Sequence, residues 1–84
     1  MHKTHPLIIP RLKRAEGHLR AVIKMIEHGK PCLVLAQQLH AVESAVAKAK
    51  KALIHDHIEH CLEEGRSADL KTALRELKQL AKYL

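Results

Sequence analysis

With 84 residues, a formal net charge of +6 and no Phe or Trp, the chain is short, basic and poor in rings for a core. The positive charge favours an acidic partner, and no apolar run approaches the roughly 20 residues that span a bilayer, which excludes a membrane protein. We expect one domain over residues 1–84, with residues 1–6 as a flexible tail. Because the start lacks a signal-peptide pattern, a cytoplasmic location is predicted.

The first predicted helix begins around Pro6 and Pro10 and ends at Gly29-Lys30-Pro31. Proline suits a helix start, and glycine commonly follows a helix end. Apolar residues recur at alternating spacings of four and three, which indicates a packing seam: Ile8, Leu12, Ala15, Leu19, Val22 and Ile26.

The second predicted helix runs from about Pro31 to Glu64 without an interior Gly or Pro. Its seam repeats the same spacing: Leu35, Leu39, Val42, Val46, Ala49 and Leu53. Such a helix is about 50 Å long, whereas a globule of this size has a diameter of about 25–30 Å. The helix therefore predicts a partner chain.

Gly65 ends that helix, and Ser67 can cap a third one. Its apolar stripe consists of Leu70, Leu74, Leu77 and Leu80. The sequence thus predicts an all-α protomer of three helices.

Three candidate metal ligands continue the second seam at its two ends. Cys32 lies near the start of the long helix, while His57 and Cys61 lie near its end, four residues apart on one face. Because about 37 Å of straight helix separates Cys32 from His57, one chain cannot close the site. Antiparallel pairing of two chains brings the three together, twice per homodimer. Two thiolates and an imidazole favour Cu(I), or Zn(II) with a fourth ligand.

Other interpretations of these residues remain open. His2 and His5 can supply nitrogen ligands, which would favour Ni(II) or Co(II). Cys32 and Cys61 can form a thiol switch between facing chains, or can be small buried side chains. The remaining histidines, His18 among them, are interpreted as surface or satisfied polar residues.

Basic residues cluster at Arg11, Lys13 and Arg14 and again at Lys48, Lys50 and Lys51. On an antiparallel dimer these clusters can form one face that contacts phosphates. The alternative is a solvated surface. The lack of aromatic residues argues against single-stranded nucleic acid.

The chain resembles the CsoR/RcnR/FrmR family of bacterial repressors over roughly residues 10–82. The matching segments are Arg11–Leu19, Cys32, Gln37–Val42 and Asp56–Cys61. The resemblance implies an antiparallel four-helix-bundle dimer, a dimer-of-dimers tetramer, and binding to double-stranded operator DNA without a helix-turn-helix motif. Metal binding at the dimer interface would release the DNA and derepress an efflux or detoxification operon.

The resemblance also assigns residues to roles. Cys32, His57 and Cys61 match the ligands of the copper-sensing branch, and Arg11, Arg14 and Lys48 match the family's DNA contacts. Copper sensors have a tyrosine before the first cysteine and a glutamate on the third helix that supports the histidine. Pro31 stands in the first place, and Glu76 matches the second.

The branches of the family differ at these positions. The nickel and cobalt sensors carry histidine in place of Cys61, the formaldehyde sensors lack that cysteine, and the persulfide sensors lack the histidine. The combination here favours a Cu(I)-responsive repressor, with a Ni(II)/Co(II) sensor, a persulfide sensor and a copper-buffering chaperone as alternatives. An enzyme is not expected, because no nucleophile and base are paired in the sequence.

Overall fold

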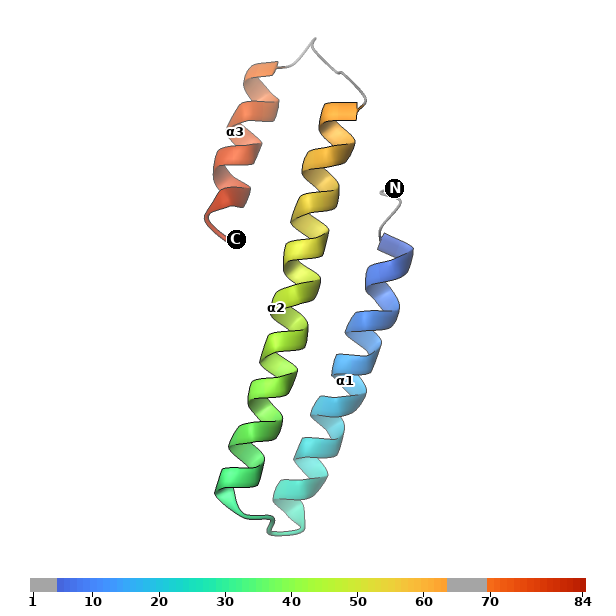
Figure 1. Ribbon diagram of the computed structural model, residues 1–84, viewed down its shortest axis with the longest axis vertical. Helices are drawn as coiled ribbons and strands as arrows, with labels where there is room; N and C mark the ends of the chain where they lie inside the picture. The colour runs from blue at the N-terminus through green and yellow to red at the C-terminus, as the bar shows by residue number, and fades with distance from the viewer. Residues whose placement is uncertain (1–4, 64–69) are drawn as a thin grey trace.

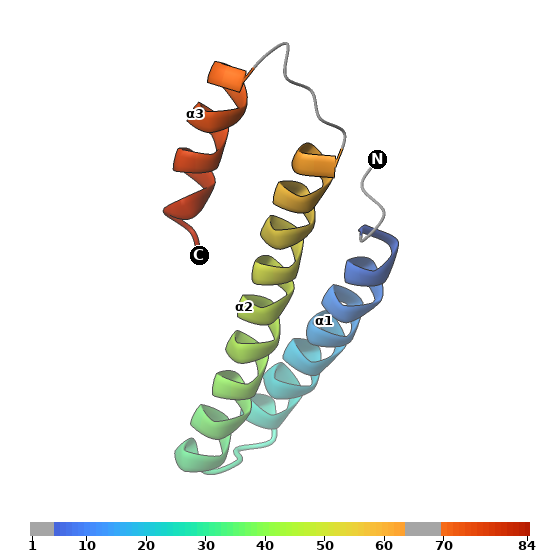
Figure 2. The same cartoon turned by 45° about the horizontal axis from the view of Figure 1, so that its top comes forward.

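The computed structural model describes residues 5–63 and 70–84, which form three helices: α1 (His5–Glu27), α2 (Cys32–Glu63) and α3 (Leu70–Ala81). Side chains are described for residues 6–60 and 70–84. Figures 1 and 2 both show α1 and α2 as a long hairpin, with α2 between α1 and α3. No strand occurs in these two ranges, so the predicted all-α three-helix protomer is confirmed.

The turn between α1 and α2 forms where the sequence predicts a break. Gly29 adopts a positive φ of 71°, a backbone conformation that side chains with a Cβ rarely adopt. The amide of Gly29 donates to the carbonyl of Ile26 at 3.0 Å, and that of Lys30 donates to Met25 at 3.0 Å. These bonds satisfy the last carbonyls of α1 and reverse the chain.

The start of α1 differs from the sequence expectation. The helix begins at His5, inside the predicted tail, and Pro10 lies within it instead of marking its start. Pro6 is tolerated because the first amides of a helix have no carbonyl partner. Pro10 removes one internal hydrogen bond, yet the flanking apolar residues still pack. Residues 1–4 lie outside the described residues.

The core between α1 and α2 uses half of each predicted seam. Every seventh residue is buried on α1, namely Ile8, Ala15 and Val22, and α2 contributes Val42, Ala49 and Ile54. The alternate positions of the seams are between 39% and 54% exposed: Leu12, Leu19, Ile26, Leu39, Val46 and Leu53. We call these six residues the exposed seam.

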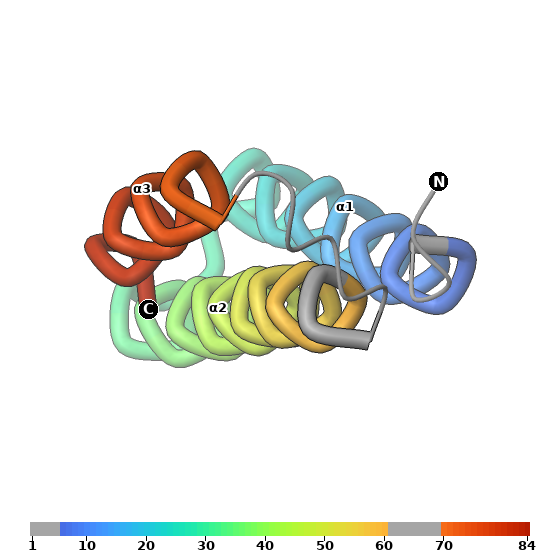
Figure 3. The backbone as a smooth tube through the Cα atoms, turned by 90° about the horizontal axis from the view of Figure 1, so that it is seen from above, coloured from blue at the N-terminus to red at the C-terminus, as the bar shows by residue number. Residues whose placement is uncertain are grey.

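Helix α3 lies against the last part of α2. Ala73, Leu77 and Leu80 are half-buried, whereas Leu70 and Leu74, also in the predicted stripe, are 61% and 50% exposed. Seen along the long axis, α3 lies beside α2 and away from the start of α1 (Figure 3). Within the described ranges, no helix is long and apolar enough to span a bilayer.

Two glycines test this account of the hairpin. Gly29→Ala should destabilise the fold by about 1 kcal/mol, because alanine is strained at positive φ. Gly17→Ala should instead stabilise it by up to about 1 kcal/mol, since Gly17 is inside α1 and a Cβ there meets nothing within 4 Å. Urea unfolding of each variant measures both effects. Equal effects of the two substitutions would contradict the assigned turn.

Candidate metal centre and basic groove

The three predicted metal ligands all belong to α2. Cys32 is its first residue, whereas His57 and Cys61 lie in its last two turns. Because the helix is continuous, Cys32 and His57 are about 37 Å apart along its axis. No group of three or more potential metal ligands gathers among the described side chains of this single chain. The fold therefore separates the predicted ligands as the sequence expects, and a second chain is needed to bring them together.

The individual ligands differ in how much the structure describes. The thiol of Cys32 is exposed at the beginning of α2. The backbone of Cys61 lies one helical turn after His57, but its side chain is outside the described residues. His2 and the side chain of His5 also lie outside them. The ligand roles of Cys61, His2 and His5 stay predictions.

A direct contact joins His57 to Glu76, the residue that the resemblance places beside it. The Nε2 atom of His57 lies 2.7 Å from Oε1 of Glu76, with the two side chains 25% and 49% exposed. The contact connects α2 with α3, and it fixes the plane of the imidazole. A carboxylate in this position orients a histidine for metal binding and increases its basicity as a ligand.

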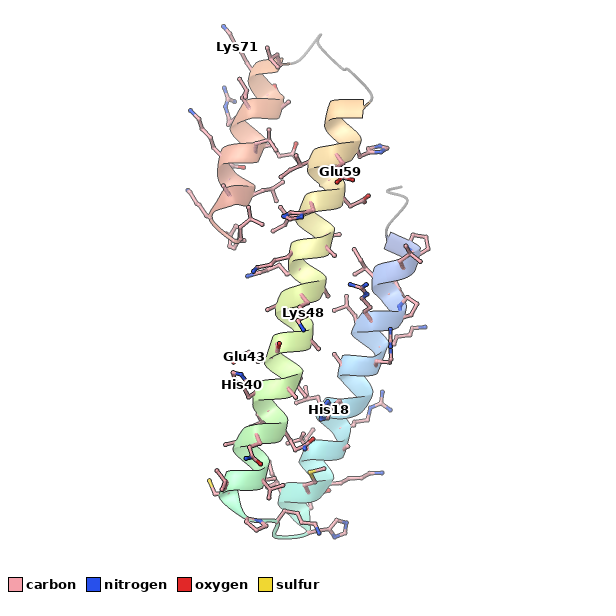
Figure 4. All side chains as sticks on the ribbon, viewed as in Figure 1. His18, His40, Glu43, Lys48, Glu59 and Lys71 are labelled. Carbon is pink, nitrogen blue, oxygen red and sulfur yellow. The ribbon has the colours of Figure 1, made fainter. Side chains whose placement is uncertain are left out.

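A second candidate site is an open groove between α1 and α2, with a volume of about 400 Å³. Arg11 and Arg14 line it from α1, and Lys48 lines it from α2; Ala15, His18 and Ala45 complete the lining. The three predicted DNA contacts thus come together in one place, although they are far apart in the sequence. Figure 4 shows Lys48 on α2, nearer its middle than His18. We call this feature the basic groove.

The charges of the basic groove are not neutralised by the chain itself. Among the described residues, the carboxylates with recorded ion pairs bind elsewhere: Glu16 pairs with Arg20 at 3.2 Å, and Glu43 lies 3.8 Å from His40. Three cations around a concave surface attract a phosphate, and arginine can bind it through two nitrogens. The basic groove can therefore hold part of a phosphodiester backbone.

Sequence analysis did not assign His18 to this site. Its Nε2 atom lies 2.7 Å from Oε1 of Gln38 on α2, and both side chains are partly buried. A signal was present, because His18 follows Arg14 by four residues and Arg11 by seven, which places the three on one face of α1.

Comparisons with known proteins agree with these two sites. The family described as metal-sensitive transcriptional repressor matches residues 4–83. The copper-sensing transcriptional repressor CsoR of Mycobacterium ulcerans is 35% identical over 77 residues, covering 87% of this chain and 63% of the relative. The CsoR of Bacillus subtilis is 34% identical over 76 residues, covering 89% and 75%. The chain therefore spans slightly less than two thirds of the mycobacterial relative.

Two solved structures share the fold. The copper-sensing repressor CsoR with Cu(I) from Geobacillus thermodenitrificans matches with a TM-score of 0.85 and 31% identity, over 98% of this chain and 86% of that one. The nickel-responsive transcriptional regulator InrS matches with a TM-score of 0.84 and 27% identity, over 100% and 97%. The fold is thus common to sensors of different metals.

The contact between His57 and Glu76 predicts how α3 is held. Glu76→Ala should speed amide exchange in α3 by up to about fivefold, because a partly exposed pair contributes at most about 1 kcal/mol. Hydrogen–deuterium exchange of the metal-free protein measures this for α3, with α1 as the internal reference. Gln79→Ala, at another exposed position of α3, is the matched control. Equal exchange in both variants would contradict the anchoring role of Glu76.

Proposed function

This chain belongs to the metal-sensitive transcriptional repressors, and from that membership we propose that it is a Cu(I)-responsive repressor of operator DNA. It is a metal-sensing transcriptional repressor of the CsoR family and not an enzyme. In the proposed cycle, the metal-free protein binds double-stranded operator DNA. Cu(I) binding weakens that complex and derepresses a copper efflux or detoxification operon.

The observation that carries the proposal is the placement of the metal candidates at the two ends of α2, with the exposed seam between them. An aliphatic surface of this kind is expected to be covered by another protein surface. A second copy running antiparallel would cover it and would place Cys32 of one chain beside His57 and Cys61 of the other. This homodimer is a four-helix bundle with two equivalent sites. Pairing of dimers would give the homotetramer that the family resemblance implies.

The choice of Cu(I) rests on the ligand chemistry and on the relatives. Two thiolates and an imidazole form a soft set of low coordination number, which suits Cu(I). The reducing cytoplasm, where we place the protein, keeps both thiols available. The relatives from Mycobacterium ulcerans and Bacillus subtilis are named copper-sensing.

A Ni(II) or Co(II) sensor is the second candidate, because the nickel-responsive InrS has the same fold. It would require additional nitrogen ligands, for which His2 and His5 are the candidates. Zn(II) would similarly require a fourth ligand. The response to each metal separates these options.

The DNA part of the proposal is supported by the basic groove. Arg11, Arg14 and Lys48 surround one open volume without a carboxylate partner in the described residues. Cations presented in this way bind the backbone of duplex DNA, and the released counterions make the affinity depend on salt.

Metal titration of a protein–DNA complex tests the proposal. A duplex is first selected from a random pool by the reduced, metal-free protein, and binding is followed anaerobically by fluorescence anisotropy. We expect about one Cu(I) per chain to release the duplex. Cys32→Ala and His57→Ala should still bind the duplex but should resist release, since each removes one ligand. His40→Ala, an exposed histidine elsewhere on α2, should behave like the unchanged protein.

The other outcomes are equally informative. Release by Ni(II) but not by Cu(I) would contradict the copper assignment and favour the second candidate. Failure of the pool to yield any bound duplex would contradict the repressor mechanism.

Salt dependence tests the basic groove itself. Arg11→Ala should weaken duplex binding and should reduce the slope of log affinity against log salt by about 0.9 for each lost phosphate contact. Lys13→Ala is the control, because Lys13 lies on the same helix but lines a different surface depression with Ile9, Leu12 and Glu16. Equal changes of the slope in both variants would contradict a specific role for the groove.

A further inference from the structure

His18 lies in the wall of the basic groove, together with Arg11 and Arg14 from its own helix and Lys48 from α2. Figure 4 places it between α1 and α2. Its position one turn after Arg14 puts its ring beside the cations that we propose bind phosphate. The ring is therefore placed to contact the same ligand.

Gln38 fixes the hydrogen-bonding state of one nitrogen of this ring. The Nε2 atom of His18 lies 2.7 Å from Oε1 of Gln38, in a partly buried bond between residues 20 apart in the sequence. An amide oxygen only accepts hydrogen bonds, so Nε2 donates and carries a proton. The ability of the ring to bind a further group then depends on Nδ1.

The state of Nδ1 differs between the two forms of the ring. In the neutral form with its proton on Nε2, Nδ1 is an acceptor and cannot bond to a phosphodiester oxygen, which also only accepts. In the imidazolium form both nitrogens donate, and the added positive charge attracts the phosphate. A phosphate in the groove is therefore bound by the protonated ring.

From this geometry we propose that His18 is a fourth phosphate-binding residue of the basic groove, and that DNA binding takes up a proton on its Nδ1 atom. The proposal rests on the proposed function, because it requires DNA phosphates in that groove. The proton comes from the solvent, and no covalent bond changes other than its transfer to Nδ1.

The other charged groups of the groove do not change over the relevant pH interval. Arg11 and Arg14 face His18 from α1 and Lys48 from α2, while Gln38 is neutral. Arginine and lysine stay protonated from about pH 6 to pH 8, so His18 is the one lining residue whose charge changes there. Because the complex holds one more proton per groove than the free protein, affinity rises as pH falls, by at most about tenfold per pH unit.

The test compares duplex affinity at about pH 6 and pH 8 at constant ionic strength, with the reduced metal-free protein and the duplex selected from the random pool. His18→Gln keeps a side-chain amide that can donate to Gln38 but does not titrate. We expect this substitution to reduce the pH 6 to pH 8 affinity ratio by about tenfold, corresponding to the loss of one protonation per groove. His40→Gln, at an exposed position of α2, should leave the ratio unchanged.

Nitrogen-15 NMR of the histidine rings provides a second measurement that does not depend on a folded variant. The proposal expects Nδ1 of His18 to be protonated in the DNA complex at neutral pH. An unprotonated Nδ1 there, or an unchanged affinity ratio in folded His18→Gln, overturns the proposal while DNA binding stands. Absence of duplex binding at every pH would instead contradict the proposed function.

Discussion

The length of α2 is the constraint on which the rest of the structure depends. This helix has 32 residues, and the chain extends over 57 Å along its longest axis. One helix, α1, runs along most of it, and α3 covers a short part near its end (Figure 1). A single chain consequently buries half of each seam, leaves the exposed seam uncovered, and keeps Cys32 far from His57. Both the apolar surface and the incomplete metal site are resolved by a second copy running antiparallel.

The hairpin carries its two proposed activities in separate places. The basic groove is built between α1 and α2, whereas the metal candidates lie at the ends of α2. His57 is joined to α3 through Glu76, so a metal ion at His57 would compete with or redirect a contact that holds α3. The metal would therefore act on the DNA site through helix positions, and not by occupying the groove. Separate sites coupled through a shared element fit the definition of an allosteric repressor.

The sequence predicts much of this fold for identifiable reasons. Both ends of α2 were predicted within one residue, because no Gly or Pro occurs between Pro31 and Gly65. The seam periodicity could not tell which alternate residues α1 buries and which it leaves exposed, since both sets share the same repeat. His18 was missed because its partner Gln38 is 20 residues away and leaves no local pattern. Glu76 came from the family resemblance, and the structure places it against His57, while its role in metal binding stays a prediction.

Complementation between two defective chains tests the shared metal site most directly. Cys32→Ala alone and the double variant His57→Ala/Cys61→Ala should each fail to hold Cu(I) against a chromophoric chelator. After subunit exchange, a mixed dimer combines Cys32 of one chain with His57 and Cys61 of the other, and therefore contains one intact site. The account predicts that mixing restores tight Cu(I) binding at one site per mixed dimer. If mixing restores no binding although mixed dimers form, the metal site does not lie between two chains and the central claim is wrong.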